Sequence, residues 1–271
     1  MKLPNRNQII LLAAVILLVL AWFALVNLRS LNGPESIAWD ELGKRFLVSN
    51  VKGGSIVSMD VNGKFSPFLK KGLSAPKGII AKANKLYVAD QTELKIIQLD
   101  KATISQVIPI TGAVMLNDVA LDKSGLVYIT DTSANCVFIV NPDTKTVDKV
   151  VSPLLKAPNG IVYDMPRNQM FIVGFSNQAS ILALSTVDRS LTTFMDSIYS
   201  NLDGIAIDDL GRIYFSSWEQ DMIVEVPQEQ NRFVAKYKDI KDAADMLYYL
   251  PNNELIIPLF SQNKVIRIPL D

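Results

Sequence analysis

The sequence predicts an all-β protein, a six-bladed β-propeller preceded by an N-terminal transmembrane or signal helix. The first observation is a strand–turn–strand unit that recurs six times along the 271 residues. The second is the interval between successive copies, 40 to 44 residues, which is typical of propellers with several strands in each blade. The third is that the apolar runs are short, whereas helical repeats of this length need amphipathic segments of about ten residues or more.

The clearest copy is the stretch 202–218, LDGIAIDDLGRIYFSSW. Residues 202–204 are interpreted as a turn, 205–207 as the innermost strand, 208–211 as a polar turn and 212–216 as the second strand. Asp and Gly are typical of tight turns, and Ile, Tyr and Phe are typical of a half-buried strand. The six copies begin at Pro34, Pro76, Leu116, Pro158, Leu202 and Ala244.

Further strands complete the blades. In blade one we expect strands at 36–39, 45–49 and 55–59, and an outer strand at 65–69 that follows the turn-forming pair Asn62-Gly63. Blades two to five repeat this order.

Blade six differs from the others because the sequence stops after its third strand. Strands are expected at 246–250, 254–259 and 264–268. We therefore predict a three-stranded sixth blade, or one closed by a very short strand from residues 27–32. A three-stranded blade would leave an exposed sheet edge.

Composition excludes several classes of function. The 27 basic and 27 acidic residues give no net charge, so nothing indicates nucleic-acid binding. The chain has no histidine, which excludes Ser-His-Asp and Cys-His catalysis and histidine metal ligands. The single cysteine, Cys136, cannot form an internal disulfide and is expected to be a buried structural thiol in the strand 136–140.

The N-terminus predicts contact with a membrane. Lys2 and Arg6 precede an apolar run at 9–26, which is close to the minimum length for crossing a bilayer, and Trp22 fits an interfacial anchor. Residues 1–32 are therefore expected to be an anchor or signal segment with a short linker, and 33–271 the propeller. The basic residues predict a cytoplasmic N-terminus and an extracytoplasmic, periplasmic propeller. The alternative is a signal peptide that is cleaved, with secretion of the propeller.

One column of the repeat carries polar side chains. It is the second residue of each copy, which begins the innermost strand and should face the central channel at one mouth. Its members are Glu35, Lys77, Asn117, Asn159, Asp203 and Asp245. Carboxylate and amide oxygens are the ligands that Ca²⁺ prefers, and Zn²⁺, Mg²⁺ or Mn²⁺ could occupy such a site.

The same column has a structural interpretation. Asn-Gly and Asp-Gly are ordinary turn pairs, which explains Asn159 and Asp203 without any ligand. It does not explain Glu35, because glutamate rarely forms turns. Lys77 argues against a metal, because its ammonium group would repel a cation unless it moved aside.

The blade motifs resemble the SMP-30/gluconolactonase/LRE-like family from Pro34 to the end of the chain. The segment GPES at 33–36 is also similar to strictosidine-synthase-like propellers. The first resemblance implies one divalent ion in the channel. Its ligands would be Glu35, Asn159 in PNGIVYD and Asp203 in LDGIAID, with Asn117 at the ion or its water.

The resemblance further implies hydrolysis of a lactone or ester bound in the channel. The ion would polarise the carbonyl and lower the pKa of a bound water, and Asp203 would serve as ligand and general base. The sugar lactonases of the family carry an arginine where this chain has Met115, so we expect a more apolar ligand. Lys77 is expected to bind a substrate carboxylate or to pair with Asp203 or Glu35.

Two alternatives remain open at this point. One is a non-catalytic propeller that binds a ligand or protein partner around a structural ion. The other is strictosidine-synthase-like condensation, for which Asp245 would act as acid and base. Asp90 and Asp131, which end second strands, could line the channel or stabilise turns, and Trp218 could shape the mouth or pack inside.

Overall fold

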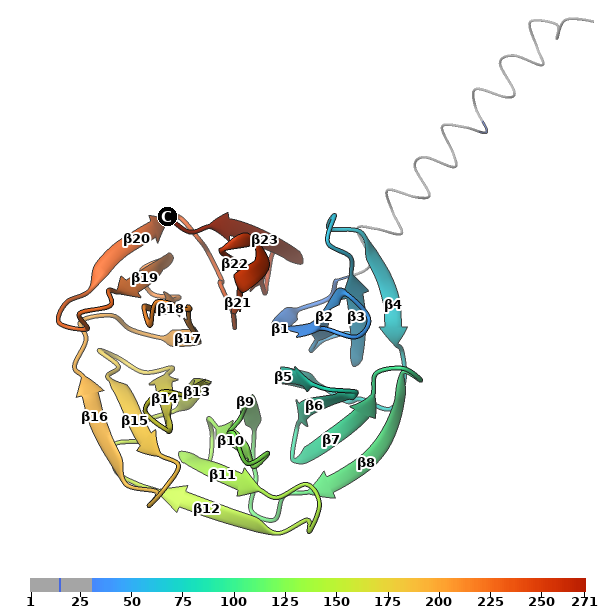
Figure 1. Cartoon of the computed structure of the whole chain (residues 1–271), viewed down its shortest axis with the longest axis horizontal. Coiled ribbons are helices and arrows are strands. Elements are labelled where there is room, and N and C mark those ends of the chain that lie inside the picture. Colours follow the sequence, from blue (N-terminus) through green and yellow to red (C-terminus); the bar gives the residue numbers. More distant parts are fainter. Residues whose placement is uncertain (1–14, 16–30) are drawn as a thin grey trace, which may run out of the picture.

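The computed structural model describes residue 15 and residues 31–271, and these form six antiparallel sheets arranged in a ring (Figure 1). The predicted all-β, six-bladed propeller is confirmed. The predicted membrane segment at 9–26 lies outside the described residues except for Val15. Within the described part of the chain, no helix combines the length and the hydropathy that a bilayer crossing requires.

Each blade begins with an inner strand beside the channel, followed by an antiparallel second strand. The inner strands are β1 (Pro34–Asp40), β5 (Pro76–Lys82), β9 (Leu116–Leu121), β13 (Pro158–Asp164), β17 (Leu202–Ile207) and β21 (Leu247–Tyr249). The second strands are β2 (Arg45–Asn50), β6 (Lys85–Asp90), β10 (Val127–Asp131), β14 (Gln169–Gly174), β18 (Ile213–Ser217) and β22 (Glu254–Leu259).

The third and fourth strands lie progressively farther from the channel (Figure 1). The third strands are β3 (Ser55–Met59), β7 (Glu93–Gln98), β11 (Cys136–Val140), β15 (Ile181–Ser185), β19 (Met222–Val226) and β23 (Lys264–Pro269). The outer strands are β4 (Phe65–Leu69), β8 (Thr103–Pro109), β12 (Val147–Val151), β16 (Leu191–Met195) and β20 (Val234–Lys238).

Blade six has three strands in the order β21-β22-β23, as one of the two predicted arrangements requires. A short 3₁₀ helix, η1 (Leu250–Asn252), connects β21 to β22. Among the described residues, no strand from the beginning of the propeller joins this sheet. The ring is therefore closed by contacts between blade six and blade one rather than by a shared sheet.

The core consists of six apolar clusters, and each cluster fills the space between two neighbouring blades. Phe46 and Tyr249 join blades one and six, with ring centroids 4.9 Å apart. Phe171 and Phe215 lie together between blades four and five. Cys136 is fully buried between blades two and three, as predicted, and burial raises the pKa of its thiol to about 11.

The prediction of a turn at residues 202–204 was wrong, because these residues belong to β17. Gly204 is needed there because the backbone of blade six approaches closely: a Cβ at this position would lie 2.5 Å from the carbonyl oxygen of Ala244. At Gly160 a Cβ would lie 2.3 Å from the carbonyl oxygen of Asp203. Glycine therefore permits neighbouring inner strands to pack against each other, and the turn interpretation of these pairs does not hold.

Candidate functional site

Five inner strands, and in blade six the segment just before β21, place one polar residue each at the same end of the channel. Equivalent positions of neighbouring strands lie side by side, since Asp245 N donates to the carbonyl oxygen of Glu35 at 3.0 Å. All six strands therefore begin at one mouth, which we call the upper mouth, and end at the opposite, lower mouth. The six residues, hereafter the polar ring, are Glu35, Lys77, Asn117, Asn159, Asp203 and Asp245.

A β-bulge supports this arrangement in five of the blades. The pairing register between inner and second strand shifts between Pro34 and Ile37, and at the equivalent positions of blades two to five. A bulge redirects a side chain relative to a regular ladder. It lies at the polar ring in each case, so the same local irregularity positions the ring residues of these blades.

Glu35 and Lys77 form an ion pair at the upper mouth. Nζ of Lys77 lies 3.2 Å from Oε1 of Glu35, and the two side chains are 19% and 7% exposed. The positive charge of Lys77 also opposes the rise that burial and repulsion from Glu35 cause in the pKa of Asp203, so the ammonium group acts on both acids. Lys77 thus pairs with Glu35, one of the two partners expected for it.

The two amides of the ring are linked to the blade that follows, Asn117 through Thr132 of its own blade and Asn159 directly. Nδ2 of Asn117 donates to Oγ1 of Thr132 at 2.8 Å, and this hydroxyl donates to the carbonyl oxygen of Pro158 at 2.8 Å. The side chain of Asn159 forms a hydrogen bond to the carboxylate of Asp203. Because the amide nitrogen of Asn117 is engaged, its carbonyl oxygen is the atom left to contact a ligand.

Two acids of the ring, Asp203 and Asp245, take up protons more readily than ordinary carboxyl groups. Burial raises the pKa of Asp203 well above its usual value, and repulsion from Glu35 and Asp245 adds to this rise. Burial also raises the pKa of Asp245 to about 7, although hydrogen bonds from Ser36 and from the Met246 amide oppose the shift. The upper mouth therefore concentrates negative charge that one ammonium group balances in part.

This donor set fits a hard divalent cation. Glu35 and Asp203 supply carboxylate oxygens, and Asn117 and Asn159 supply amide oxygens, which are ligands that Ca²⁺ accepts. Within residues 31–271, no three His, Cys, Asp or Glu side chains are grouped so that they could hold a metal ion. A site here would thus depend on the amides as well as the acids, and Lys77 would have to leave Glu35.

Two other acids considered from the sequence have structural roles. Asp90 accepts hydrogen bonds from the amides of Ser74 and Ala75 and forms a 2.7 Å ion pair with Lys95. Asp131 accepts from three backbone amides, those of Val114, Met115 and Ala134. Both carboxylates stabilise turns at the upper mouth. Met115 itself lies half-buried directly before β9.

A second set of equivalent residues lies above the polar ring, where each second strand ends. The amides of Thr132, Phe175 and Trp218 donate to the carbonyl oxygens of Met115, Ala157 and Asn201, which precede inner strands. Thr132 contacts the ring residue Asn117, so side chains at this position can reach the ring.

Three consecutive blades carry aromatic rings at or beside this position. The ring centroids of Phe175 and Trp218 are 5.6 Å apart, and those of Trp218 and Phe260 are 6.1 Å apart. Nε1 of Trp218 donates to the carbonyl oxygen of Ala243 at 2.6 Å, which fixes the indole. We call these three residues the aromatic arc. Sequence reasoning named Trp218 alone, although the same offset after each second strand indicates Phe175 and Phe260.

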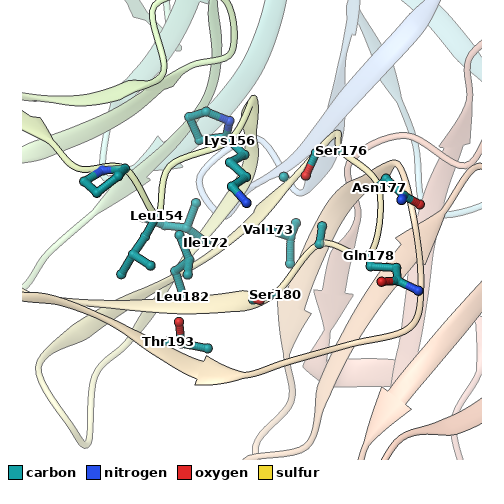
Figure 2. Close-up of a pocket in the computed structure, with 14 residues that line it drawn as sticks. Leu154, Lys156, Ile172, Val173, Ser176, Asn177, Gln178, Ser180, Leu182 and Thr193 are labelled. Carbon is teal, nitrogen blue, oxygen red and sulfur yellow. The ribbon is translucent and has the colours of Figure 1, made fainter.

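A separate hollow of about 130 Å³ lies on blade four (Figure 2). Its polar side chains, including Lys156, Asn177 and Gln178, come from the loops around β13 and β14, and Leu154 and Ile172 supply apolar surface. No polar-ring residue lines it. The hollow is therefore distinct from the candidate site in the channel.

Similar solved structures share this architecture. A gluconolactonase from Xanthomonas campestris is 15% identical and matches with a TM-score of 0.76, covering 90% of this chain and 89% of its own. The virginiamycin B lyase of Staphylococcus aureus, as a catalytically inactive variant with a histidine replaced by alanine, is 14% identical, with a TM-score of 0.67 and coverage of 90% and 97%. A luciferin-regenerating enzyme is 14% identical, with a TM-score of 0.68 and coverage of 89% and 92%. At these identities the likeness shows the fold.

Comparison with curated protein sequences gives no match. The family model for the SMP-30/gluconolactonase/LRE-like region matches residues 33–238, which includes the inner strands of blades one to five and five of the six ring residues. The chain therefore belongs to the SMP-30/gluconolactonase/LRE-like family.

Proposed function

We propose that this protein hydrolyses a lactone or ester at the upper mouth of its channel, in a site completed by a divalent ion. The observation that carries the proposal is the buried pair Glu35 and Asp203, 5% and 4% exposed, which repel each other and lie beside two amides. The family is named in part for gluconolactonase, and lactone hydrolysis is the reaction that we assign to this arrangement of acids and amides.

Asp203 is the residue we assign to proton transfer. Burial raises the pKa of its carboxyl group toward neutral pH. A general base accepts a proton from water most effectively when its pKa lies near the working pH. The hydrogen bond from Asn159 fixes its orientation. When bound, a divalent ion would act as a Lewis acid toward the substrate carbonyl. The residues that would hold it are Glu35, Asn117, Asn159 and Asp203.

The aromatic arc supports an apolar substrate. Phe175 is 36% exposed and Trp218 and Phe260 are half-buried, so their rings offer apolar surface close to the polar ring. Met115 stands where the sugar lactonases have an arginine. We therefore propose an alkyl or aryl lactone or ester rather than a polyhydroxylated sugar lactone, with Lys77 and Asp245 beside the bound substrate.

A lyase reaction like that of the staphylococcal neighbour is not favoured. Replacement of one histidine accompanies loss of catalysis in that protein, and this chain contains no histidine. The alternative favoured by a specific observation is non-catalytic binding of a ligand or protein partner. In that case the ion pair between Lys77 and Glu35 would stabilise the channel without turnover.

The deciding experiment uses the full-length chain, in which the predicted anchor at 9–26 would tether an exported propeller to the membrane. Recovery in membranes after alkaline washing would support the anchor. Metal content is then measured, and turnover is assayed on alkyl lactones, aryl esters and glucono-lactone. We expect one ion per chain and hydrolysis of alkyl lactones that EDTA removes and Ca²⁺, or another divalent ion, restores.

Variants connect this activity to the aromatic arc. Trp218→Ala should raise KM for alkyl lactones by roughly tenfold to a hundredfold, because the lost ring contact removes apolar burial of roughly 1.5–3 kcal/mol. Phe68→Ala, on the outer strand β4, is the matched control and should leave KM unchanged. Absence of both ion binding and turnover would rule out the hydrolase and favour the non-catalytic alternative.

A further inference from the structure

The lower part of the channel contains a cavity of about 310 Å³ below the polar ring. This volume is near the lower end of the roughly 300–1,000 Å³ of small-molecule sites. All six inner segments contribute to its wall, mainly through residues that follow the polar ring toward the lower mouth. The apolar lining includes Ile37, Ile79, Val119, Ile161, Ile205 and Met246.

Two carboxylates lie against this apolar wall. Oδ1 and Oδ2 of Asp118 accept from the amides of Val119 and Ile161 at 2.7 and 2.8 Å. Oδ2 of Asp245 accepts from Oγ of Ser36 at 2.6 Å. These donors are neutral, so they orient the acids without balancing their charge. The described residues lining the cavity include these two acids and no basic side chain.

The other end of the cavity carries aromatic side chains with acidic neighbours. Trp39 and Tyr248 line it, and they follow the polar ring by four and three residues, toward the lower mouth. Nε1 of Trp39 donates to Oε2 of Glu41 at 2.5 Å, and the hydroxyl of Tyr248 donates to Oδ1 of Asp209 at 2.8 Å. These hydrogen bonds satisfy the polar tips of the two side chains, so their ring faces add apolar surface at this end of the cavity.

We propose that the lower cavity binds an elongated apolar molecule with a primary amine head group. The ammonium group would lie between Asp118 and Asp245, whose oxygens can each accept one more hydrogen bond. The hydrocarbon tail would extend along the apolar wall toward Trp39 and Tyr248. An ammonium head favours the ionised form of both acids, whereas those ionised acids would repel a carboxylate head and a neutral head would leave their charge unbalanced. This site shares Asp245 with the upper mouth, but it needs neither the ion nor the turnover proposed there.

The test is calorimetric titration of the full-length chain, in EDTA, with propylamine, butylamine, pentylamine and hexylamine. The matched probes are the corresponding alcohols and hexanoate. We expect affinity to increase roughly fourfold with each added methylene, because each is transferred from water to an apolar wall. Hexylamine should bind at least about tenfold more tightly than hexanol, because its hydrogen bonds to carboxylates are charge-assisted.

Variants locate the binding site. Asp118→Asn should remove the preference for amine over alcohol, and Ala81→Leu should weaken hexylamine more than propylamine, because it fills the cavity while both acids remain. Glu35→Gln at the upper mouth and Asp122→Asn at the end of the blade-three inner segment are the controls, and neither lines the cavity.

Two results would overturn the proposal. One is equal affinity for amines and alcohols, or no binding of either. The other is loss of amine binding in Glu35→Gln while Ala81→Leu has no effect, which would place the amine at the upper mouth. Because Ala81→Leu keeps every charge and hydrogen bond of the two acids, the test remains valid if Asp118→Asn fails to fold.

Discussion

The two ends of the channel are built by the same strands but differ in chemistry. At the upper mouth the second residue of each repeat supplies acids, amides and one ammonium group beneath the aromatic arc. Farther along the same strands, Ile37, Ile79 and Ile161 form an apolar wall with two acids at its edge. The repeat thus places polar side chains at one end of the channel and apolar side chains at the other. Sequence differences between the six copies determine which residues each end contains.

The largest expected effect concerns Asp203. Replacing it with Asn removes the proton acceptor, so kcat for lactone hydrolysis should fall by roughly 10²–10⁴-fold. Asn keeps the size of the side chain, and circular dichroism should show an intact fold. Asp122→Asn, which alters another buried acid outside the ring, should leave kcat within about threefold. An equal loss in both variants would mean that the upper mouth has no special role.

A smaller effect is expected at Lys77. Lys77→Met removes the positive charge beside Glu35 and Asp203, so affinity for Ca²⁺ should increase by about tenfold or more. The ion-free protein should melt at a lower temperature, because Glu35 loses its partner. Lys82→Met, at the other end of β5, is the matched control. Titration with Ca²⁺ measures the difference, and unchanged affinity in Lys77→Met would contradict a cation site in the ring.

The smallest effect is the dependence of stability on pH. The pKa of Asp245 is raised to about 7 in the folded state, so between about pH 4 and pH 7 the folded protein holds a proton that the unfolded chain has released. This contribution to stability should therefore be complete below about pH 4 and be lost as pH rises to 7, with a decrease of about 1–3 kcal/mol between pH 5 and pH 8. The raised pKa values of Asp203 and Asp118 act in the same direction.

Thermal unfolding between pH 5 and pH 8 measures this dependence. No histidine titrates in this range, so the signal comes mainly from the channel acids. Asp245→Asn should flatten the plot of melting temperature against pH. Saturating Ca²⁺, bound at the upper mouth, should also reduce the slope of this plot. A melting temperature that rises from pH 5 to pH 8 would contradict the raised pKa values of the channel acids.

Much of the fold follows from local sequence patterns. The spacing of the six copies fixed which residues are equivalent, and the strand predicted at 45–49 corresponds to β2 at Arg45–Asn50. Because the six ring residues occupy the same position of the repeat, the sequence predicted that they would lie together at one mouth. The turn predicted at 202–204 failed because the need for Gly204 arises from a neighbouring blade, and local propensity contains no such information.

The details of the site depend on how neighbouring blades are offset from one another. The hydrogen bonds of Thr132 to Pro158 and of Ser36 to Asp245 join residues of different blades, 26 and 209 positions apart. No short-range pattern predicts such pairs. The lower cavity was also missed, because isoleucine and valine in an inner strand are indistinguishable in sequence from residues of a filled core.

The seam between blades six and one has a mechanical consequence. In the described residues no sheet crosses it, and the hydrogen bonds that do include Asp245 N to the Glu35 carbonyl, Ser36 to Asp245, and Gly33 N to Oδ1 of Asn263. A ring pulled by its two ends should open at this seam, because the chain does not connect blade six to blade one and only hydrogen bonds such as these and side-chain packing resist the load. Glu35 lies on one side of the seam and Asp203 on the other. A ligand held by both would therefore fasten the ring, raising the force needed to open it and slowing its unfolding.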